Sequence, residues 1–326
     1  MRESDAMSPG DAMRRSRSSN RRIRWRRRAA AGLSFVFLLV LIAPADVGAA
    51  VPSLPPNTGC DGDAVVAKLS VIEDRAAANM LAETVRSLTR SGRCLLDAGD
   101  PSTGHVPAGT RQQASGADRV YVVGGPGAIP DAWLTGTLGV NSSTRIAGGN
   151  RWETQAEVAN AIIRLTLGQP LEPYSGSQAS SPTLPPNTDC TQHTVLVKLN
   201  VVEDRAAANM LAEALDVLQT ISASARCLVD VGDPQSNQAP ASSSRDEANS
   251  AATAFVVGGA GAISDSWLNR HFDIPTPTRV SGSDRWATQK AVADLIIELA
   301  RATSSSGHDA GDVGGGDEPG DADAEN

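Results

Sequence analysis

Short apolar runs alternate with stretches of helical periodicity through residues 60–168. Four runs are short and rich in aliphatic residues, which predicts buried strands: Ala64–Leu69, Cys94–Ala98, Arg119–Val123 and Thr144–Ala147. Four stretches between and after them predict helices: Asp74–Arg90, Thr110–Gly116, Pro130–Leu138 and Arg151–Leu167. Strands that alternate with helices predict an α/β fold whose mainly parallel sheet has helices on both faces.

The same pattern occurs twice. The stretch EDRAAANMLAE stands at Glu73–Glu83 and again, unchanged, at Glu203–Glu213. We therefore predict two tandem Rossmann-like three-layer modules, at residues 51–167 and 184–303. Residues 168–183 are rich in Pro, Ser and Gly and predict a linker, and the acidic, Gly-rich residues 304–326 predict a disordered tail.

The N-terminus predicts export. The basic run Arg21–Arg28 precedes the uncharged apolar stretch Ala29–Ala45, which small residues follow. This order is typical of a secretory signal peptide, predicted here as residues 1–50. The alternative is an uncleaved signal anchor, and only in that case would the protein be held in a membrane.

The charge of the rest of the chain argues against a nucleic-acid partner. The chain has 29 Lys and Arg against 37 Asp and Glu, and its first 50 residues hold ten of the Arg and four of the acidic residues. The remainder thus carries 19 basic and 33 acidic residues, a formal net charge of −14. Such a surface repels phosphate backbones.

The four cysteines fall two per repeat at matching places. Cys60 and Cys190 precede the first strand of each copy, and Cys94 and Cys227 begin the second. Neighbouring parallel strands start at the same edge of a sheet, so we predict disulfides Cys60–Cys94 and Cys190–Cys227 in an oxidising compartment. Zinc is the alternative, but no His recurs between the copies, and we predict no metal site.

No pattern indicates catalysis. Both copies lack G-x-S-x-G, H-E-x-x-H and Walker-type motifs, and we predict neither catalytic residues nor a cofactor. Gly124-Gly125 and Gly258-Gly259 each follow a strand and precede a helix. Such glycines either approach a phosphate or simply allow a tight turn, and both interpretations stay open.

RIAGGNRWET (Arg145–Thr154), RVSGSDRWAT (Arg279–Thr288) and the strand–GGxGAI–helix segments resemble the cell wall binding repeat family, type 2. The resemblance covers nearly all of residues 60–168 and 190–302, and it places Asp74 and Asp204 at the Asp of the family's helix start. It implies a Rossmann-like module that attaches surface proteins non-covalently to the cell wall through anionic wall polymers. Family members often carry three repeats, whereas this chain has two. A homo-oligomer would supply further repeats.

Several repeated side chains are candidates for such binding. Arg75 and Arg205 are expected at the carboxyl end of a strand, where they either contact a polymer anion or pair with the adjacent Glu73 or Glu203. Arg145, Arg151, Arg279 and Arg285 flank Gly turns and either support the turns or bind the ligand. Asp74 and Asp204 are expected to cap helices. Trp152 and Trp286 are expected to pack on the sheet, with sugar stacking as the alternative.

Together these features predict a secreted, non-catalytic protein associated with the cell wall, whose partner is an anionic glycopolymer. The alternatives are a self-assembling surface protein whose repeats bind each other, and a degenerate small-molecule-binding domain that uses the Gly-Gly turns.

Overall fold

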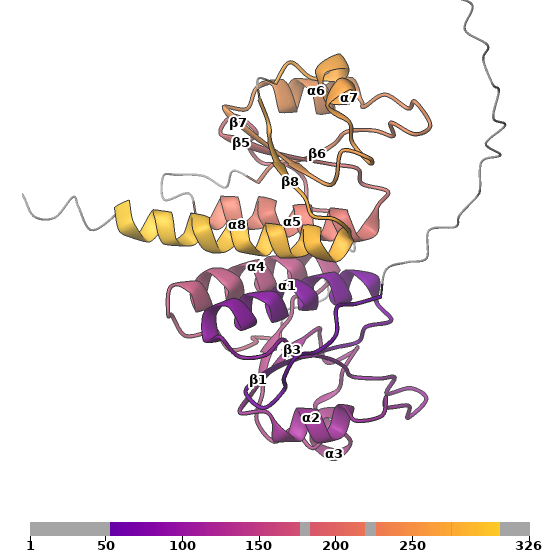
Figure 1. Cartoon of the computed structure of the whole chain (residues 1–326), viewed down its shortest axis with the longest axis vertical. Helices are drawn as coiled ribbons and strands as arrows, with labels where there is room; N and C mark the ends of the chain where they lie inside the picture. The colour runs from indigo at the N-terminus through magenta and orange to yellow at the C-terminus, as the bar shows by residue number, and fades with distance from the viewer. Residues whose placement is uncertain (1–52, 177–182, 219–225, 275, 307–326) are drawn as a thin grey trace, which may run out of the picture. The chain divides into compact units, whose positions relative to one another are not determined.

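The computed structural model describes residues 53–176, 183–218, 226–274 and 276–306, which all belong to one compact unit. The predicted leader and nearly all of the predicted acidic tail lie outside these residues. The described chain forms two α/β modules, each with four parallel strands that alternate with helices (Figure 1). The predicted fold class is therefore confirmed.

The second module repeats the element order of the first. The strands are β1 (Asp63–Ala67), β2 (Leu95–Asp97), β3 (Arg119–Val123), β4 (Thr144–Ile146), β5 (His193–Val197), β6 (Leu228–Asp230), β7 (Thr253–Val257) and β8 (Thr278–Val280). The helices are α1 (Ile72–Thr89), α2 (Thr110–Gly116), α3 (Asp131–Gly136), α4 (Arg151–Thr166), α5 (Val202–Leu218), α6 (Ser242–Asn249), α7 (Asp265–His271) and α8 (Arg285–Ser306). The strands run in the order β2-β1-β3-β4 and β6-β5-β7-β8.

Alternate residues of a strand face different helices because successive side chains point to opposite sides of a sheet. In β1, Val65 and Ala67 belong to the hydrophobic cluster that contains α1 and α4. Ala64 and Val66 belong to a second cluster, with residues of α2 and α3. All five residues of β1 are buried. This explains why every residue of β1 after Asp63 is apolar, since a central parallel strand is covered on both faces.

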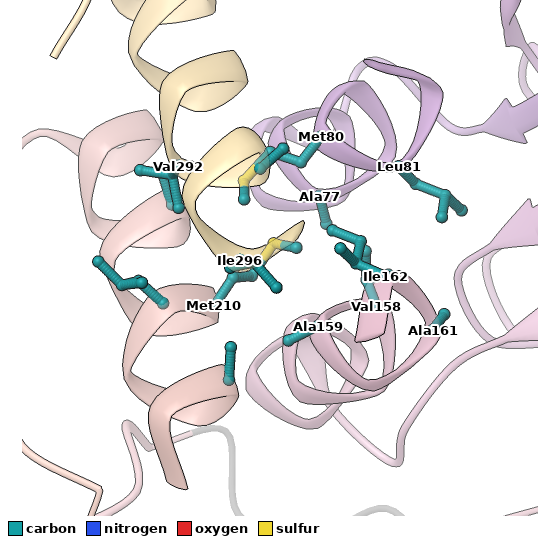
Figure 2. Close-up of a cluster of buried hydrophobic side chains, with 14 of the residues drawn as sticks. Ala77, Met80, Leu81, Val158, Ala159, Ala161, Ile162, Met210, Val292 and Ile296 are labelled. Carbon is teal, nitrogen blue, oxygen red and sulfur yellow. The ribbon is translucent and has the colours of Figure 1, made fainter. Parts of the chain in front are cut away.

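The two modules pack against each other through α1 and α4 of the first and α5 and α8 of the second. Side chains of all four helices form one hydrophobic cluster, which includes Met80, Ile162, Met210 and Ile296 (Figure 2). Many of the buried positions are alanine, which lets helix backbones approach closely. The repeats thus cover each other's apolar faces.

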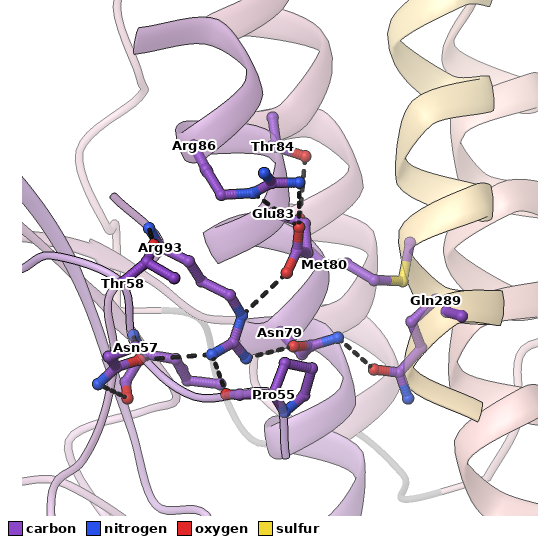
Figure 3. Close-up of polar contacts among 12 residues, drawn as sticks. Pro55, Asn57, Thr58, Asn79, Met80, Glu83, Thr84, Arg86, Arg93 and Gln289 are labelled. Carbon is purple, nitrogen blue, oxygen red and sulfur yellow. Dashed lines mark hydrogen bonds and ion pairs between the residues drawn. The ribbon is translucent and has the colours of Figure 1, made fainter. Parts of the chain in front are cut away.

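Buried amides cross this interface at two matching places. Asn79 Nδ2 donates to Gln289 Oε1 at 2.9 Å, and Asn209 Nδ2 donates to Gln155 Oε1 at 3.0 Å. Behind Asn79, the buried Arg93 guanidinium donates to Asn79 Oδ1 at 2.6 Å and pairs with Glu83 (Figure 3). Desolvation lowers the pKa of Arg93, and Glu83 opposes that shift. Asn79 is thus hydrogen-bonded on both sides, which offsets the cost of burying its amide.

Both predicted disulfides, Cys60–Cys94 and Cys190–Cys227, are present, each with a Cα–Cα distance of 5.0 Å. Element boundaries differ slightly from the predictions. The helix predicted from Asp74 begins at Ile72, and α8 continues to Ser306, into the first residues of the predicted tail. Among the described residues, none of the helices has the length and apolarity needed to cross a bilayer.

Candidate functional site

Each sheet has a topological switch point between its two central strands. The segment after β1 enters α1 on one face, whereas the segment after β3 enters α3 on the other face. In open α/β sheets, ligands bind beyond the carboxyl ends of strands at such a point. The equivalent place in the second module lies beyond β5 and β7. These two carboxyl edges are therefore the candidate positions for a ligand site.

The Gly-Gly turn after β3 uses its backbone groups within the module. Gly124 has a φ of +119°, which favours glycine, and its N–H donates to Ile146 O at 3.1 Å. The N–H groups of Ala128 and Ile129 both donate to Gly125 O. Gly258-Gly259 in the second module has the same bonds, from Gly258 to Val280 and from Ala262 and Ile263 to Gly259. These contacts belong to a tight turn.

Arg145 holds this turn from the neighbouring strand. Its guanidinium donates to Gly124 O at 2.6 Å, to Ile129 O at 2.8 Å and to Asp131 Oδ1 at 2.6 Å. Arg279 likewise donates to Gly258 O and to Asp265. The turn-supporting role considered for these two arginines is the one that their contacts fit.

Arg75 and Arg205 reach across to the opposite module. Arg75 Nη2 lies 3.6 Å from Glu203 Oε1, and its guanidinium lies over the Trp286 ring, 5.4 Å from the centroid. Arg205 Nη2 lies 3.5 Å from Glu73 Oε1, and its guanidinium lies over Trp152 at 5.1 Å. The acidic partner that the sequence suggested was the adjacent glutamate of the same copy. The actual partner belongs to the other copy, and each tryptophan packs under an arginine.

Arg151 and Arg285 complete the group. Arg151 Nη1 donates to Glu73 Oε1 at 2.6 Å, and Arg285 Nη1 donates to Glu203 Oε1 at 2.5 Å. Together with two aspartates these side chains form what we call the charged junction: Glu73, Asp74, Arg75, Arg151, Glu203, Asp204, Arg205 and Arg285. The junction contains four carboxyl groups and four guanidinium groups, and both repeats contribute the same set.

These contacts show that four helices begin at the same place. Glu73 in the first turn of α1 meets Arg151 at the start of α4 and Arg205 in the first turn of α5. Glu203 meets Arg285 at the start of α8. Each helix N-terminus carries a partial positive charge of about +0.5, so converging N-termini repel one another, and acidic first turns offset this repulsion. The carboxyl edges of the two sheets consequently meet at the charged junction.

Asp74 lies below the Gly-Gly turn. It is 9% exposed, and its Oδ2 would lie 3.5 Å from a Cβ at Gly124; for Asp204 and Gly258 that distance is 3.4 Å. Desolvation and the neighbouring Glu73 raise the pKa of Asp74 to about 6, and Arg151 opposes the shift. Desolvation and Glu203 likewise raise the pKa of Asp204 to about 6. Two carboxyl groups of the junction therefore titrate close to neutral pH.

The predicted capping role of Asp74 is wrong, because the helix starts earlier. The N-cap of α1 is Val71, no side chain caps it, and Asp74 is the third helical residue. By contrast, Asn150 caps α4 by accepting from the N–H groups of Trp152 and Glu153. Asp284 Oδ1 does the same at the start of α8. These caps occupy backbone N–H groups at the starts of α4 and α8 that could otherwise bind an anion.

Comparison with protein-family models, curated proteins and solved structures finds no match to this chain. The resemblance to the cell wall binding repeat family therefore stays a prediction.

Proposed function

We propose that this chain is an exported, non-catalytic protein of the cell envelope, which attaches non-covalently to an anionic cell wall polymer through the charged junction. The two disulfides are compatible with an extracellular location. The predicted signal peptide points to the same compartment.

The meeting of two equivalent carboxyl edges is the observation that carries this proposal. A polymer presents the same anionic unit many times, and a receptor with two equal contact places side by side can hold two units at once. The second contact then forms at high effective concentration, so that modest individual contacts give firm attachment. The side chains of Arg151 and Arg285 are 48% and 29% exposed, so solvent reaches both guanidinium groups.

The junction also reconciles an acidic chain with an anionic ligand. Above pH 6 its four carboxylates balance its four guanidinium groups. As the pH falls through about 6, Asp74 and Asp204 take up protons and the junction becomes positive by two charges. Attachment to a polyanion should therefore strengthen between about pH 8 and about pH 5.

A sedimentation assay with purified, protein-free cell walls tests the proposal. The mature protein should pellet with walls, more completely at about pH 5 than at about pH 8, and removal of the acidic polymers should abolish pelleting. Arg151→Ala and Arg285→Ala should each weaken attachment about tenfold, because a hydrogen bond to a charged group contributes about 1.5 kcal/mol. Arg111→Ala is the matched control: it removes the same charge from an exposed position on α2.

Two results would contradict the proposal. Pelleting that survives polymer removal would point to another ligand or to self-association. If Arg111→Ala weakened attachment as much as Arg151→Ala does, the loss of net charge alone would explain the weakening. The charged junction would then have no specific role in binding.

A further inference from the structure

A cavity of about 440 Å³ lies where the segment after α4 passes the edge of the first sheet. Its walls come from the end of β4, one face of α4, Gln169, residues 171–175 and Val217 of α5. Val217 is one of two large apolar side chains that are exposed among the described residues. The cavity shares only Arg145 with the site candidates discussed above, and no residue with the charged junction.

The segment that closes the cavity is fixed to α4. Arg164 Nη1 donates to Pro170 O at 3.1 Å and lies 3.0 Å from Glu172 Oε1. The N–H of Gln169 donates to Arg164 O, and Leu171 packs on the hydrophobic cluster that the two modules share. The cavity is thus preformed, as small-molecule sites usually are.

Four polar side chains in its walls have hydrogen-bonding capacity to spare. Glu157 and Asn160 lie on one face of α4, and Gln169 and Tyr174 lie on the segment opposite. Within the described parts of the chain, none of these four side chains makes a hydrogen bond to another protein group. Two amides, a carboxyl and a phenol therefore offer both donors and acceptors to whatever occupies the cavity.

The charges of the cavity disfavour an anion. The cation of Arg164 is paired with Glu172, and Arg145 is engaged by the turn after β3 and by Asp131. Much of Glu157 is exposed, yet desolvation raises the pKa of its carboxyl, which Arg164 counteracts. An anionic ligand would be repelled by the carboxylate of Glu157 and would find both guanidinium groups already paired. An uncharged ligand would experience no such repulsion.

The second module lacks this chemistry. The buried positions of α4 and α8 agree, as Trp152 and Trp286 or Gln155 and Gln289 illustrate. The cavity-facing positions do not: α8 has Ala291, Asp294 and Glu298 in place of Glu157, Asn160 and Arg164. Asp294 is moreover paired with Lys290.

We propose that this cavity binds a small uncharged saccharide. Planar amide and carboxyl groups suit the neighbouring hydroxyl groups of a sugar, which donate and accept at once. The ring of Tyr174 suits the apolar C–H face of a sugar, because an aromatic ring combines a large apolar surface with a polar edge. The volume lies in the range of about 300–1,000 Å³ that small-molecule sites occupy.

Ligand-observed saturation-transfer NMR on the full mature chain tests the proposal, with cellobiose, lactose and N,N′-diacetylchitobiose as probes and glucuronate as the anionic comparison. At about 10 mM, even a Kd of about 1 mM leaves a site mostly filled. We expect saturation transfer to at least one of the three neutral sugars and none to glucuronate. No transfer to any neutral sugar, or transfer to glucuronate alone, would overturn the proposal.

Variants locate the binding. The double substitution E157A/N160D introduces the residues that α8 carries at the matching positions, so the helix should tolerate it, and it should weaken binding at least tenfold. Tyr174→Ala should do the same, whereas Tyr174→Phe should keep most of the affinity because the ring remains. The matched control A291E/D294N alters the same face of α8 and should change nothing. Binding that neither E157A/N160D nor Tyr174→Ala weakens would place the sugar elsewhere and refute the assignment.

This inference goes beyond attachment to walls and is independent of it. Soluble sugars probe the cavity without any wall material, and the sedimentation assay probes the charged junction without any free sugar. Failure of one experiment therefore leaves the other interpretable.

Discussion

Replacing Asp74 by Asn should stabilise the protein near pH 8, although the substitution removes a charge from a group of ion pairs. Burial raises the pKa of Asp74 from its ordinary value of 3.8 to about 6 in the folded protein. That difference corresponds to about 3 kcal/mol, since one pKa unit is worth about 1.4 kcal/mol. Asparagine keeps the shape of the side chain and stays neutral at every pH.

The sign follows from proton linkage. Below pH 3.8 the carboxyl is protonated in both the folded and the unfolded chain, so no cost arises. Between pH 3.8 and about 6 the unfolded chain releases this proton while the folded chain still holds it, so the free energy of unfolding falls as the pH rises. Above about pH 6 the folded protein buries the ionised carboxylate, and the loss from this group levels off at about 3 kcal/mol.

Urea denaturation with intact disulfides measures the effect. Asp74→Asn should unfold at higher urea than the wild type at about pH 8, and most of this advantage should vanish at about pH 4. Asp204→Asn should behave alike, because burial and its neighbours give Asp204 the same pKa. An advantage of equal size at both pH values would refute the reasoning, as would a loss of stability at the higher pH.

Three further predictions concern groups outside the charged junction. Asp100→Asn should show the opposite pH dependence, because hydrogen bonds from Ser102 and Lys68 lower the pKa of Asp100 to about 2. The substitution should lower the free energy of unfolding at neutral pH but not at very low pH, and the same urea series checks this. Asn79→Ala should cost about 2–5 kcal/mol, because it removes the partner of Gln289 Oε1 and of Nη2 of the buried Arg93. A double-mutant cycle with Gln289→Ala should give a clear coupling energy, and strict additivity would contradict the contact. C60S/C94S should lower the free energy of unfolding by about 4 kcal/mol, as expected for a cross-link between residues 34 positions apart; alkylation of the unreduced wild type should label no thiol.

The strands, the helices and the disulfides could be predicted because each depends on local or repeated signals. The run DAVVA is apolar at almost every position, which suffices to predict a strand buried on both faces. The pairing of Cys60 with Cys94 followed from the duplicate pair in the second copy. These signals lie within one repeat and need no knowledge of how two repeats meet.

The partner of Arg75 could not be predicted in this way, because it is Glu203, far along the chain in the other module. A signal for a second packing partner was nevertheless present in α1. The stretch from Ala76 to Val85 is buried throughout, so burial is not confined to one face of this helix. A helix that is apolar nearly all round is covered on more than one side. Its alanines and methionine thus indicated that something besides its own sheet lies against it.

The reciprocity of the interface bears on how such a molecule diversifies. Each half brings both the asparagine and the glutamine, and both the arginine and the tryptophan, so either half has everything needed to recognise a copy of itself. Once joined in one polypeptide, the halves meet at a rate that no longer depends on concentration, and they are freed from remaining identical. The cavity-facing positions of α4 differ from the matching positions of α8, whereas the buried positions that contact the other half are the same in both helices. The two halves therefore present different surfaces on one side of the molecule, which two identical chains in a symmetric dimer would not do.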